Sequence, residues 1–354
     1  SFNTRLEHGT ILSNVAAQVV SRNIPQSGGS PEYAASYVTV SNCVLGAYGL
    51  RNPAYELYGN LWADYNNLFL RNGALAALSY TGSFGREYDS VGAWASSELG
   101  QDRQSLSHDP LFANAAGGDF HLRSSAGRWV AADAGWTNDA TSSPLIDAGD
   151  PAADFAAEEL PNGGRVNVGR YGNTAEASKT PTNGALTLIS FNDGGRASGT
   201  NVLVQWNARG DVTNGTVAIY YSADGGSNWT LLATNVLASA EAWTWDSTLS
   251  AQSVQGYLRI VGSDGSTAQS TGFFAVRNNP FAFYVNDGST SNDVYCTVVG
   301  NSANSGVASN SPKADLNDLL AKYDLEAGDI VYIDTGVYTP SVPWRISQAD
   351  SAGS

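Results

Sequence analysis

The sequence predicts an all-β chain in which a solenoid of short strands is followed by an antiparallel β-sandwich. A hydrophobic–polar–Asn–hydrophobic pattern recurs near the N-terminus at solenoid-like spacing. Seven short strand candidates separated by turn residues then lie between residues 186 and 276. The composition agrees, because 38 glycines with only 14% charged residues indicate turn-rich β structure. With 354 residues, 42% of them hydrophobic, the chain can form two or three domains with separate cores.

The N-terminal pattern contains Asn14, Asn42 and Asn66. These residues are separated by 42 − 14 = 28 and 66 − 42 = 24 residues, which is typical of one circuit of short strands per repeat. Asn suits a tight corner because its side chain can bond to the backbone, and we expect these asparagines to stack in a ladder. The alternative is a chance recurrence in an Asn-rich β protein. The pattern is already running at Thr10, so we expect further circuits before Ser1 to be missing or supplied by another chain.

The stretch from Asp89 to Gly172, here called the closing segment, carries four motifs in order. They are Asp109–Phe112 (DPLF), Asp119–Leu122 (DFHL), Ser143–Asp150 (SPLIDAGD) and Gly164–Tyr171 (GRVNVGRY). The series resembles the C-terminal end of pectin-lyase-like, right-handed parallel β-helix domains in large bacterial extracellular proteins. Such a segment would cover the bare edge and open core of the last rung, with short strands at Phe120–Leu122 and Val166–Val168. The alternative is an irregular loop region of an unrelated β protein.

A polar, Pro-containing stretch from Ala175 to Asn183 is predicted to be a linker. The seven strand candidates follow it, at 186–191, 202–206, 216–222, 229–233, 242–245, 256–261 and 271–276. The segment Tyr220–Leu232 resembles bacterial immunoglobulin-like or fibronectin-like modules, and it also matches a sialidase Asp-box. Because a propeller needs several such boxes and this one is single, we expect a hairpin with its turn at Asp224–Gly226 and Trp229 packed on the strand.

The C-terminal part, from Phe281 onward, resembles the opening of a second β-helix of the same class. Leu316, Leu319, Leu320 and Tyr323 share one face of a predicted short helix, and Ile330–Ile333 would begin the first full rung. The predicted domains are therefore 1–178, the C-terminal rungs and closing segment of a parallel β-helix; 184–278, an Ig/fibronectin-like β-sandwich; and 281–354, the N-terminal cap and first rung of a second parallel β-helix.

The charge balance restricts the partners. A net charge of −15, from 18 basic and 33 acidic residues, argues against nucleic acid, whose phosphates need clustered Lys and Arg. It also argues against adhesion to anionic lipid, and no apolar run could span a bilayer. Methionine is absent, so we expect an excised or processed piece of an extracellular or cell-surface protein. Cys43 and Cys296 are far apart in sequence and are expected to be free and buried.

Catalytic chemistry has little support in the residues. The β-helix resemblance includes polysaccharide lyases, glycoside hydrolases and uronan epimerases, which need paired carboxylates or a base beside a carboxylate or Ca²⁺ cluster. Arg5, Glu7 and His8 form the one acid–base grouping of the rungs, with Arg5 and Glu7 on one strand face and His8 on the other; a solvated ion pair is the simpler interpretation. His108 and His121 are expected to serve turns and packing. No catalytic, cofactor-binding or metal-binding residues are assigned.

Two weaker sites remain open as alternatives. The carboxylates of Asp287, Asp293, Asp315 and Asp318 lie near predicted loops and could bind Ca²⁺, although they form no EF-hand or nonapeptide repeat. Tyr80, Trp94 and Trp136 could stack on sugars, although such aromatic residues more often pack under loops.

The function expected from the sequence is that of a non-catalytic structural segment of a large bacterial surface protein, such as a stalk, fibre or adhesin. The alternative is part of a polysaccharide-active β-helix enzyme whose catalytic rungs lie elsewhere. The expected partners are other copies of the chain or adjoining modules, with polysaccharide as a further candidate. Residues Phe281–Pro340 of one copy could dock by strand addition onto Phe2–Ser79 of another, which would build a head-to-tail filament.

Overall fold

The computed structural model describes residues 2–13, 19–22, 24–25, 33–34, 36–49, 52–58, 60–81, 84–97, 101–320, 322–323, 325 and 328–344. The chain is all-β, as the sequence predicts. It divides into two compact units, residues 1–276 and 277–354.

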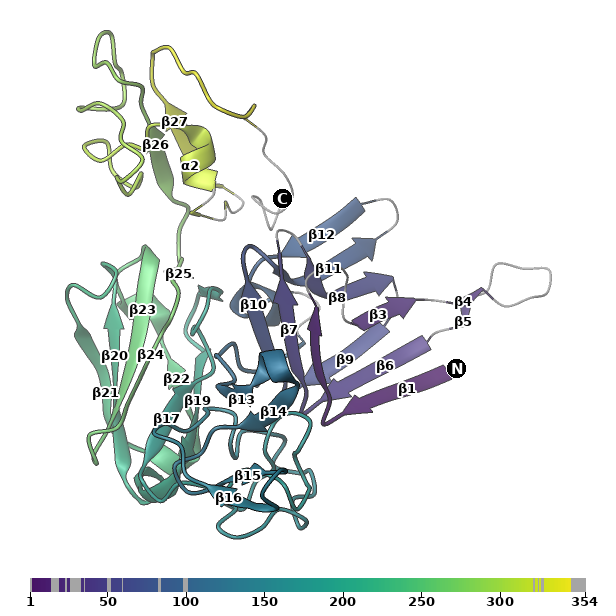
Figure 1. Cartoon of the computed structure of the whole chain (residues 1–354). Helices are drawn as coiled ribbons and strands as arrows, with labels where there is room; N and C mark the ends of the chain where they lie inside the picture. Colours follow the sequence, from purple (N-terminus) through teal and green to yellow (C-terminus); the bar gives the residue numbers. More distant parts are fainter. Residues whose placement is uncertain are drawn as a thin grey trace. The chain divides into compact units, whose positions relative to one another are not determined.

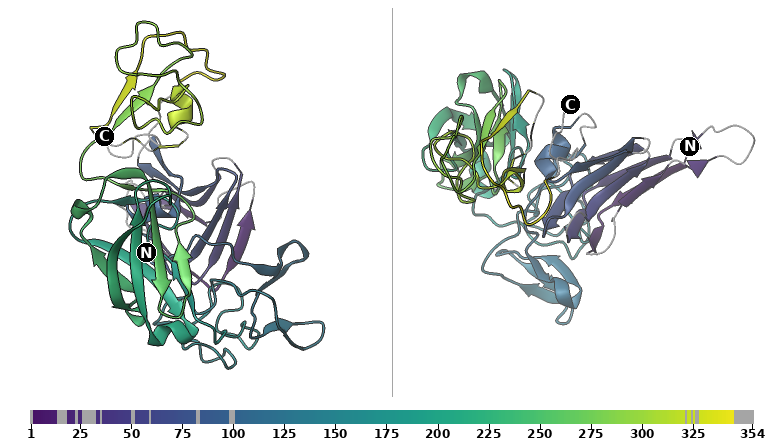
Figure 2. Two further views of the ribbon diagram at one scale, coloured as in Figure 1. Left: turned by 90° about the vertical axis from the view of Figure 1, so that its left-hand side faces the viewer. Right: turned by 90° about the horizontal axis from the view of Figure 1, so that it is seen from above.

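Three parallel sheets make up the parallel-strand region, residues 2–88 (Figures 1 and 2). Each circuit of the chain adds one strand to each sheet in turn, which is the organisation expected of a solenoid. The first sheet contains β1 (Phe2–Glu7), β6 (Ser36–Ser41) and β9 (Asn60–Asp64); the second contains β2 (Thr10–Ser13), β7 (Val44–Tyr48) and β10 (Asn67–Arg71). The third contains β3 (Val19–Arg22), β8 (Pro53–Tyr58), β11 (Leu75–Thr81) and the antiparallel β12 (Phe84–Tyr88), and β4 (Ile24–Pro25) pairs separately with β5 (Tyr33–Ala34).

The register of these sheets corrects the predicted asparagine ladder. Thr10 pairs with Val44, and Val44 with Asn67, so successive circuits span 44 − 10 = 34 and 67 − 44 = 23 residues rather than 28 and 24. Asn42 therefore lies level with Tyr65 and not with Asn66, while Asn14 lies outside the described residues. The corner position needs a left-handed backbone, which Asn tolerates well but which His and Tyr also adopt here: φ is 52° at residue 8, 54° at residue 42 and 56° at residue 65.

A different ladder follows each corner. The backbone N–H of Gly9 donates to the Cys43 sulfur (3.3 Å), that of Cys43 to the Asn66 amide oxygen (3.0 Å), and that of Asn66 to the Ser105 hydroxyl (2.8 Å). Each of these side chains thus satisfies a backbone donor one circuit earlier, which a buried backbone requires. The sequence pattern identified Asn66 as a corner residue but placed its partners one position away.

A buried carboxylate closes the top of this core. Helix α1 (Val91–Ala95) begins after Ser90, whose hydroxyl accepts from the Ala93 N–H. It places Trp94 in the core, and the indole Nε1 donates to Asp102 (3.0 Å). Trp94 is fully buried, so the prediction that it could stack on a sugar is wrong.

Short strands and turns form the rest of the closing segment. β13 (Phe112–Asn114) pairs with β14 (Asp119–Leu122), and β15 (Arg128–Val130) with β16 (Gly135–Thr137). The predicted strand 166–168 is irregular, although Val166 and Val168 are buried and their backbone groups bond to Gly149 and Leu145. The predicted linker is packed rather than free, because its buried Ser178 and Thr180 hydroxyls bond to the Leu122 carbonyl and the Asp147 carboxylate.

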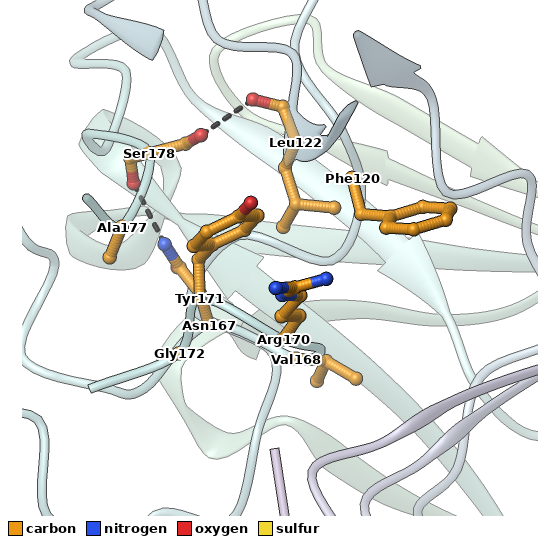
Figure 3. Close-up of a pocket in the computed structure, with 9 residues that line it drawn as sticks. All are labelled: Phe120, Leu122, Asn167, Val168, Arg170, Tyr171, Gly172, Ala177 and Ser178. Carbon is orange, nitrogen blue, oxygen red and sulfur yellow. Dashed lines mark hydrogen bonds between the residues drawn. The ribbon is translucent and has the colours of Figure 1, made fainter. Parts of the chain in front are cut away.

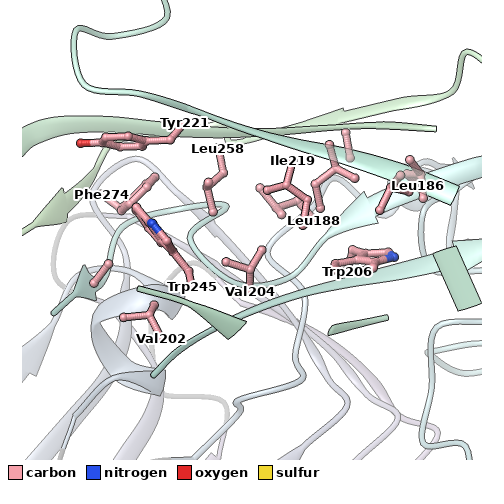
Figure 4. Packing of buried hydrophobic residues seen from close by; sticks show 14 of the residues in the cluster. Leu186, Leu188, Val202, Val204, Trp206, Ile219, Tyr221, Trp245, Leu258 and Phe274 are labelled. Atoms are coloured by element: carbon pink, nitrogen blue, oxygen red, sulfur yellow. The ribbon is translucent and has the colours of Figure 1, made fainter. Parts of the chain in front are cut away.

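Two sheets share one core in residues 185–276, here called the two-sheet module (Figure 4). One sheet contains β17 (Ala185–Leu188), β19 (Val202–Arg209) and β22 (Ala242–Trp245). The other contains β18 (Arg196–Ala197), β25 (Phe274–Val276), β23 (Ser253–Gly262), β24 (Thr267–Gln269), β20 (Thr216–Ser222) and β21 (Thr230–Leu237).

All seven predicted strands of this module are present with shifted ends, and β18 and β24 are additional. The alternating side chains of β19 point Val202, Val204 and Trp206 into the core, as expected from the period of a strand. The expected hairpin also forms: Gly225 and Gly226 adopt φ values of 69° and 92° in its turn, and Trp229 packs against β23.

The second unit contains one parallel pair and one short helix. β26 (Ala282–Val285) pairs with β27 (Ile330–Ile333), and α2 (Leu316–Leu320) lies between them in sequence. The predicted helix face is confirmed, since Leu316, Leu319 and Tyr323 are buried, and the Tyr323 ring packs on Phe283 at 5.4 Å.

Candidate functional site

The outer face of the first parallel sheet carries the predicted acid–base grouping. Arg5 and Glu7 form an ion pair of 2.8 Å on this face, with side chains 68% and 29% exposed, as the strand period predicts. Trp62 lies two circuits further along the same column, through Thr39, and is 49% exposed. Sequence reasoning missed Trp62, although its alternate position in an amphipathic strand could have indicated it.

His8 does not join this pair. It occupies the left-handed corner after β1, and burial lowers its pKa below the usual value, so the neutral imidazole is favoured. Its Nδ1 is buried without a hydrogen-bond partner among the described residues. The three residues therefore do not converge as an acid, a base and an electrostatic partner.

The Asp102 network is the most strongly perturbed group of the core. Its carboxylate accepts hydrogen bonds from Ser105 (2.6 Å), Asn66 (3.0 Å) and Trp94 (3.0 Å). Burial raises the pKa of Asp102 despite these donors, because no cation neutralises it. Asp102 is only 1% exposed, so no substrate can reach it and its role is to join successive circuits.

A small pocket lies beside Tyr171 in the closing segment (Figure 3). It encloses about 210 Å³, which is below the roughly 300 Å³ of ordinary ligand sites. The Tyr171 ring stacks on His121 at 3.6 Å, and the two ring nitrogens of His121 face Asp119 (2.6 Å) and Glu176 (3.2 Å). His121 is 4% exposed, so this arrangement holds the closing segment together, in line with the packing role expected for His121.

His108 also serves packing, at the junction with the two-sheet module. Its Nε2 lies 2.9 Å from the Leu188 carbonyl oxygen, and burial lowers its pKa. Because the neutral ring can donate this hydrogen bond, the contact does not require protonation.

The junction between the closing segment and the two-sheet module contains buried charges that sequence reasoning missed. Arg209, at the end of β19, donates to the carbonyl oxygens of Ser143 (2.6 Å) and Ile146 (3.3 Å) and is 7% exposed. Asn207 donates to the Asp147 carbonyl oxygen at 3.2 Å. Burial lowers the pKa of Arg209 and raises that of Asp147 to about 6, while the attraction between them opposes both shifts.

A second ion pair lies at the same junction. Arg165 of the closing segment contacts Glu241 of the two-sheet module at 3.0 Å, and Glu241 also accepts from the Ala208 N–H at 2.8 Å. A short polar residue at the end of a strand gives little warning of such contacts, since they join residues 76 positions apart.

The carboxylates proposed for Ca²⁺ are bonded to nearby backbone and side-chain donors. Asp287 accepts from the Ser289 and Val337 N–H groups, and the other three bond to Asn286, to Asn317 and Trp344, and to Ser302. In the described part of the chain, no three His, Cys, Asp or Glu side chains form a metal-binding group. Ca²⁺ binding stays a prediction.

The other candidate residues have packing contacts. Trp136 is half-buried and pairs with Trp129 across β15 and β16, with ring centroids 5.4 Å apart, while the Tyr80 side chain lies outside the described residues. Cys43 and Cys296 are free and buried, as expected, and burial raises the pKa of each thiol to about 12. No helix among the described residues is long and apolar enough to cross a membrane.

Comparison with known proteins gives one local similarity. A family model described as "Disaggregatase related", for a β-helix-like family, matches residues 71–149. This is 149 − 71 + 1 = 79 of the 354 residues, from β11 through most of the closing segment. No curated protein and no solved structure matches the chain.

Proposed function

We propose that the chain is a structural segment of a large extracellular bacterial surface protein, acting as a stiff element of a stalk, fibre or adhesin. In this proposal, residues 1–178 are the last circuits and closing segment of a right-handed parallel β-helix, residues 184–278 are an immunoglobulin- or fibronectin-like module, and residues 281–354 begin a second β-helix. The cyclic order of strands in three parallel sheets supports the first assignment, and the shared core of two mainly antiparallel sheets supports the second.

The observation that carries the proposal is the buried junction at Arg209. A flexible connection between modules would be polar and hydrated, whereas here a guanidinium from one module is buried against the backbone of the other. Breaking such a contact would expose buried carbonyl groups and a desolvated charge together, which is costly. The closing segment and the two-sheet module therefore support mechanical continuity rather than movement around a cleft.

An assay for polysaccharide turnover tests the non-catalytic part of the proposal. The purified chain is incubated with a panel of uronans, and unsaturated ends and reducing sugars are measured. We expect no release above that of a boiled sample. Turnover that disappears in Arg5→Gln or Glu7→Gln would overturn the proposal.

A second candidate function is suggested by the outer face of the first sheet and by the local family similarity. Arg5, Glu7 and Trp62 combine charge with an exposed aromatic ring, and the matched family is named for its relation to a disaggregatase. In this alternative the chain is part of a polysaccharide-active β-helix protein. The turnover assay distinguishes the two candidates, because a structural segment gives no product.

We also propose head-to-tail assembly through parallel strand addition, with β27 of one copy pairing with the first strands of another. Val331 and Ile333 continue the inward row of β26, and Ile330 and Val337 are 51% and 81% exposed, so strand addition would cover apolar surface. Deletion of residues 281–354 is the test, read by electron microscopy and sedimentation. Filaments of unchanged repeat from the shortened chain would contradict this mode of assembly.

A further inference from the structure

A row of aromatic side chains lies on the outer face of the larger sheet of the two-sheet module. Ile219, Tyr221 and Leu258 point into the core (Figure 4), so the alternate residues of β20 and β23 face outward. These outward residues include Tyr220, Tyr257 and Arg259.

The turn between β20 and β21 extends the row. A Cβ at Gly226 would lie 3.4 Å from the Tyr257 ring and 3.7 Å from the Trp229 ring, and one at Gly225 would lie 3.4 Å from Phe273. Tyr257 and Phe273 are themselves in contact, with ring centroids 5.0 Å apart. The glycines therefore let one turn approach three rings, which form a half-exposed strip together with Tyr220; Phe273 is 36% exposed.

Arg259 occupies the centre of this strip. Its guanidinium lies 4.1 Å from the centre of the Trp229 ring and 5.4 Å from that of Tyr220, an arrangement stabilised by cation–π attraction. No hydrogen bond or ion pair from Arg259 to another described residue is present, and its Nε is buried without an acceptor. The rings thus hold the cation in place while its terminal nitrogens remain without a protein partner.

Other arginines of the chain are neutralised by carboxylates. Arg128 pairs with Asp139 at 3.0 Å, Arg165 with Glu241 at 3.0 Å, and Arg277 with Asp329. In a chain with 33 acidic and 18 basic residues, an oriented guanidinium without a carboxylate is unusual. Its charge is complementary to an anionic ligand.

We propose that this strip, Tyr220, Trp229, Tyr257, Arg259 and Phe273, binds an acidic polysaccharide. The C–H faces of a sugar chain pack on the exposed rings, and the terminal nitrogens of the guanidinium donate to the carboxylate of a uronic acid unit. The strip is an open surface, which suits an extended polymer rather than a small molecule.

The negative net charge does not prevent this contact. Charges separated by more than about 8 Å are largely screened at physiological ionic strength, so the local guanidinium dominates over distant carboxylates. Binding should therefore weaken with added salt, because the decisive interaction is a partly exposed charge pair. This inference does not depend on the proposed structural role, since a stalk module can also bind polysaccharide.

The test compares polygalacturonate with its methyl ester, which keeps the sugar chain but removes the charge. Affinity electrophoresis and titration calorimetry on the full chain should show stronger binding of the acid form, decreasing with NaCl. Arg259→Gln should weaken binding about tenfold, as expected for loss of a charge-assisted hydrogen bond. Phe273→Ala should weaken binding of the acid and the ester alike.

Arg170→Gln is the matched control, because Arg170 is an exposed arginine over a different tyrosine, Tyr171 (5.6 Å), in the closing segment. It should bind polygalacturonate like the parent chain, and unchanged melting temperatures would show that the variants fold. Equal binding of acid and ester, or parent-like binding by Arg259→Gln, would overturn the proposal. So would absence of binding to polygalacturonate, alginate and hyaluronan together.

Discussion

Replacement of Arg209 by methionine should weaken the junction between the closing segment and the two-sheet module. The substitution keeps an unbranched apolar chain in the buried site but removes the donors to the carbonyl oxygens of Ser143 and Ile146. A hydrogen bond to a charged group contributes roughly 1.5–3 kcal/mol, and the longer contact, at 3.3 Å, should contribute less than the one at 2.6 Å. Removing a buried charge gains back part of its desolvation cost.

The net loss in unfolding free energy should therefore be about 3 kcal/mol. Urea titration of the full chain, followed by tryptophan fluorescence, measures it. Arg196→Met is the matched control, since Arg196 is an exposed arginine of the same module and its loss should change the free energy by less than about 0.5 kcal/mol. An equal effect of the two substitutions, or a loss below about 1 kcal/mol for Arg209→Met, would refute the reasoning.

Three further outcomes are expected. Trp94→Phe should lower the unfolding free energy by roughly 1.5–3 kcal/mol, because a buried carboxylate loses a donor, whereas Trp62→Phe, at a 49% exposed position, should have little effect in the same urea titration. The free energy of unfolding should fall between pH 5 and pH 8, because burial raises the pKa of Glu158 to about 7, so that folding takes up a proton in this range; greater stability at pH 8 would contradict the assignment. Cys43 and Cys296, with pKa values of about 12, should react with a thiol reagent only after denaturation, and rapid labelling of the native chain would show that the burial is wrong.

Strand positions were predictable where one face is buried. Val202, Val204 and Trp206 alternate with polar or exposed residues, and this period appears directly in the sequence. The helix face of Leu316, Leu319 and Tyr323 was predictable for the same reason. In both cases a local pattern reports burial, so no knowledge of distant contacts is needed.

Register was not predictable from spacing. The corner after each strand needs a left-handed residue, but Asn42 shares this position with Tyr65, so matching asparagines misaligned the circuits by one residue. Loop lengths differ between circuits, and a one-residue error then exchanges corner and ladder positions. The ladder through Cys43, Asn66 and Ser105 mixes three residue types, which no single-residue repeat can reveal.

The candidate sites depend still more on distant contacts. Trp94 was expected at the surface because aromatic residues in turn-rich segments can be exposed, yet Asp102 holds its indole in the core. Arg209 and Arg259 have similar local sequence surroundings in strands, but one is buried against the closing segment and the other lies over Trp229. Only the fold brings these partners together.

The central claim, that the closing segment and the two-sheet module form one stiff element, is tested most directly by a distance distribution. Spin labels are attached to Asp133→Cys, in the turn between β15 and β16, and to Thr234→Cys, on β21; both positions are exposed, and the two native cysteines are buried. Double electron–electron resonance should give a single narrow distribution for the parent junction and a broad one after Arg209→Met. A broad or multimodal distribution with Arg209 intact would contradict the claim.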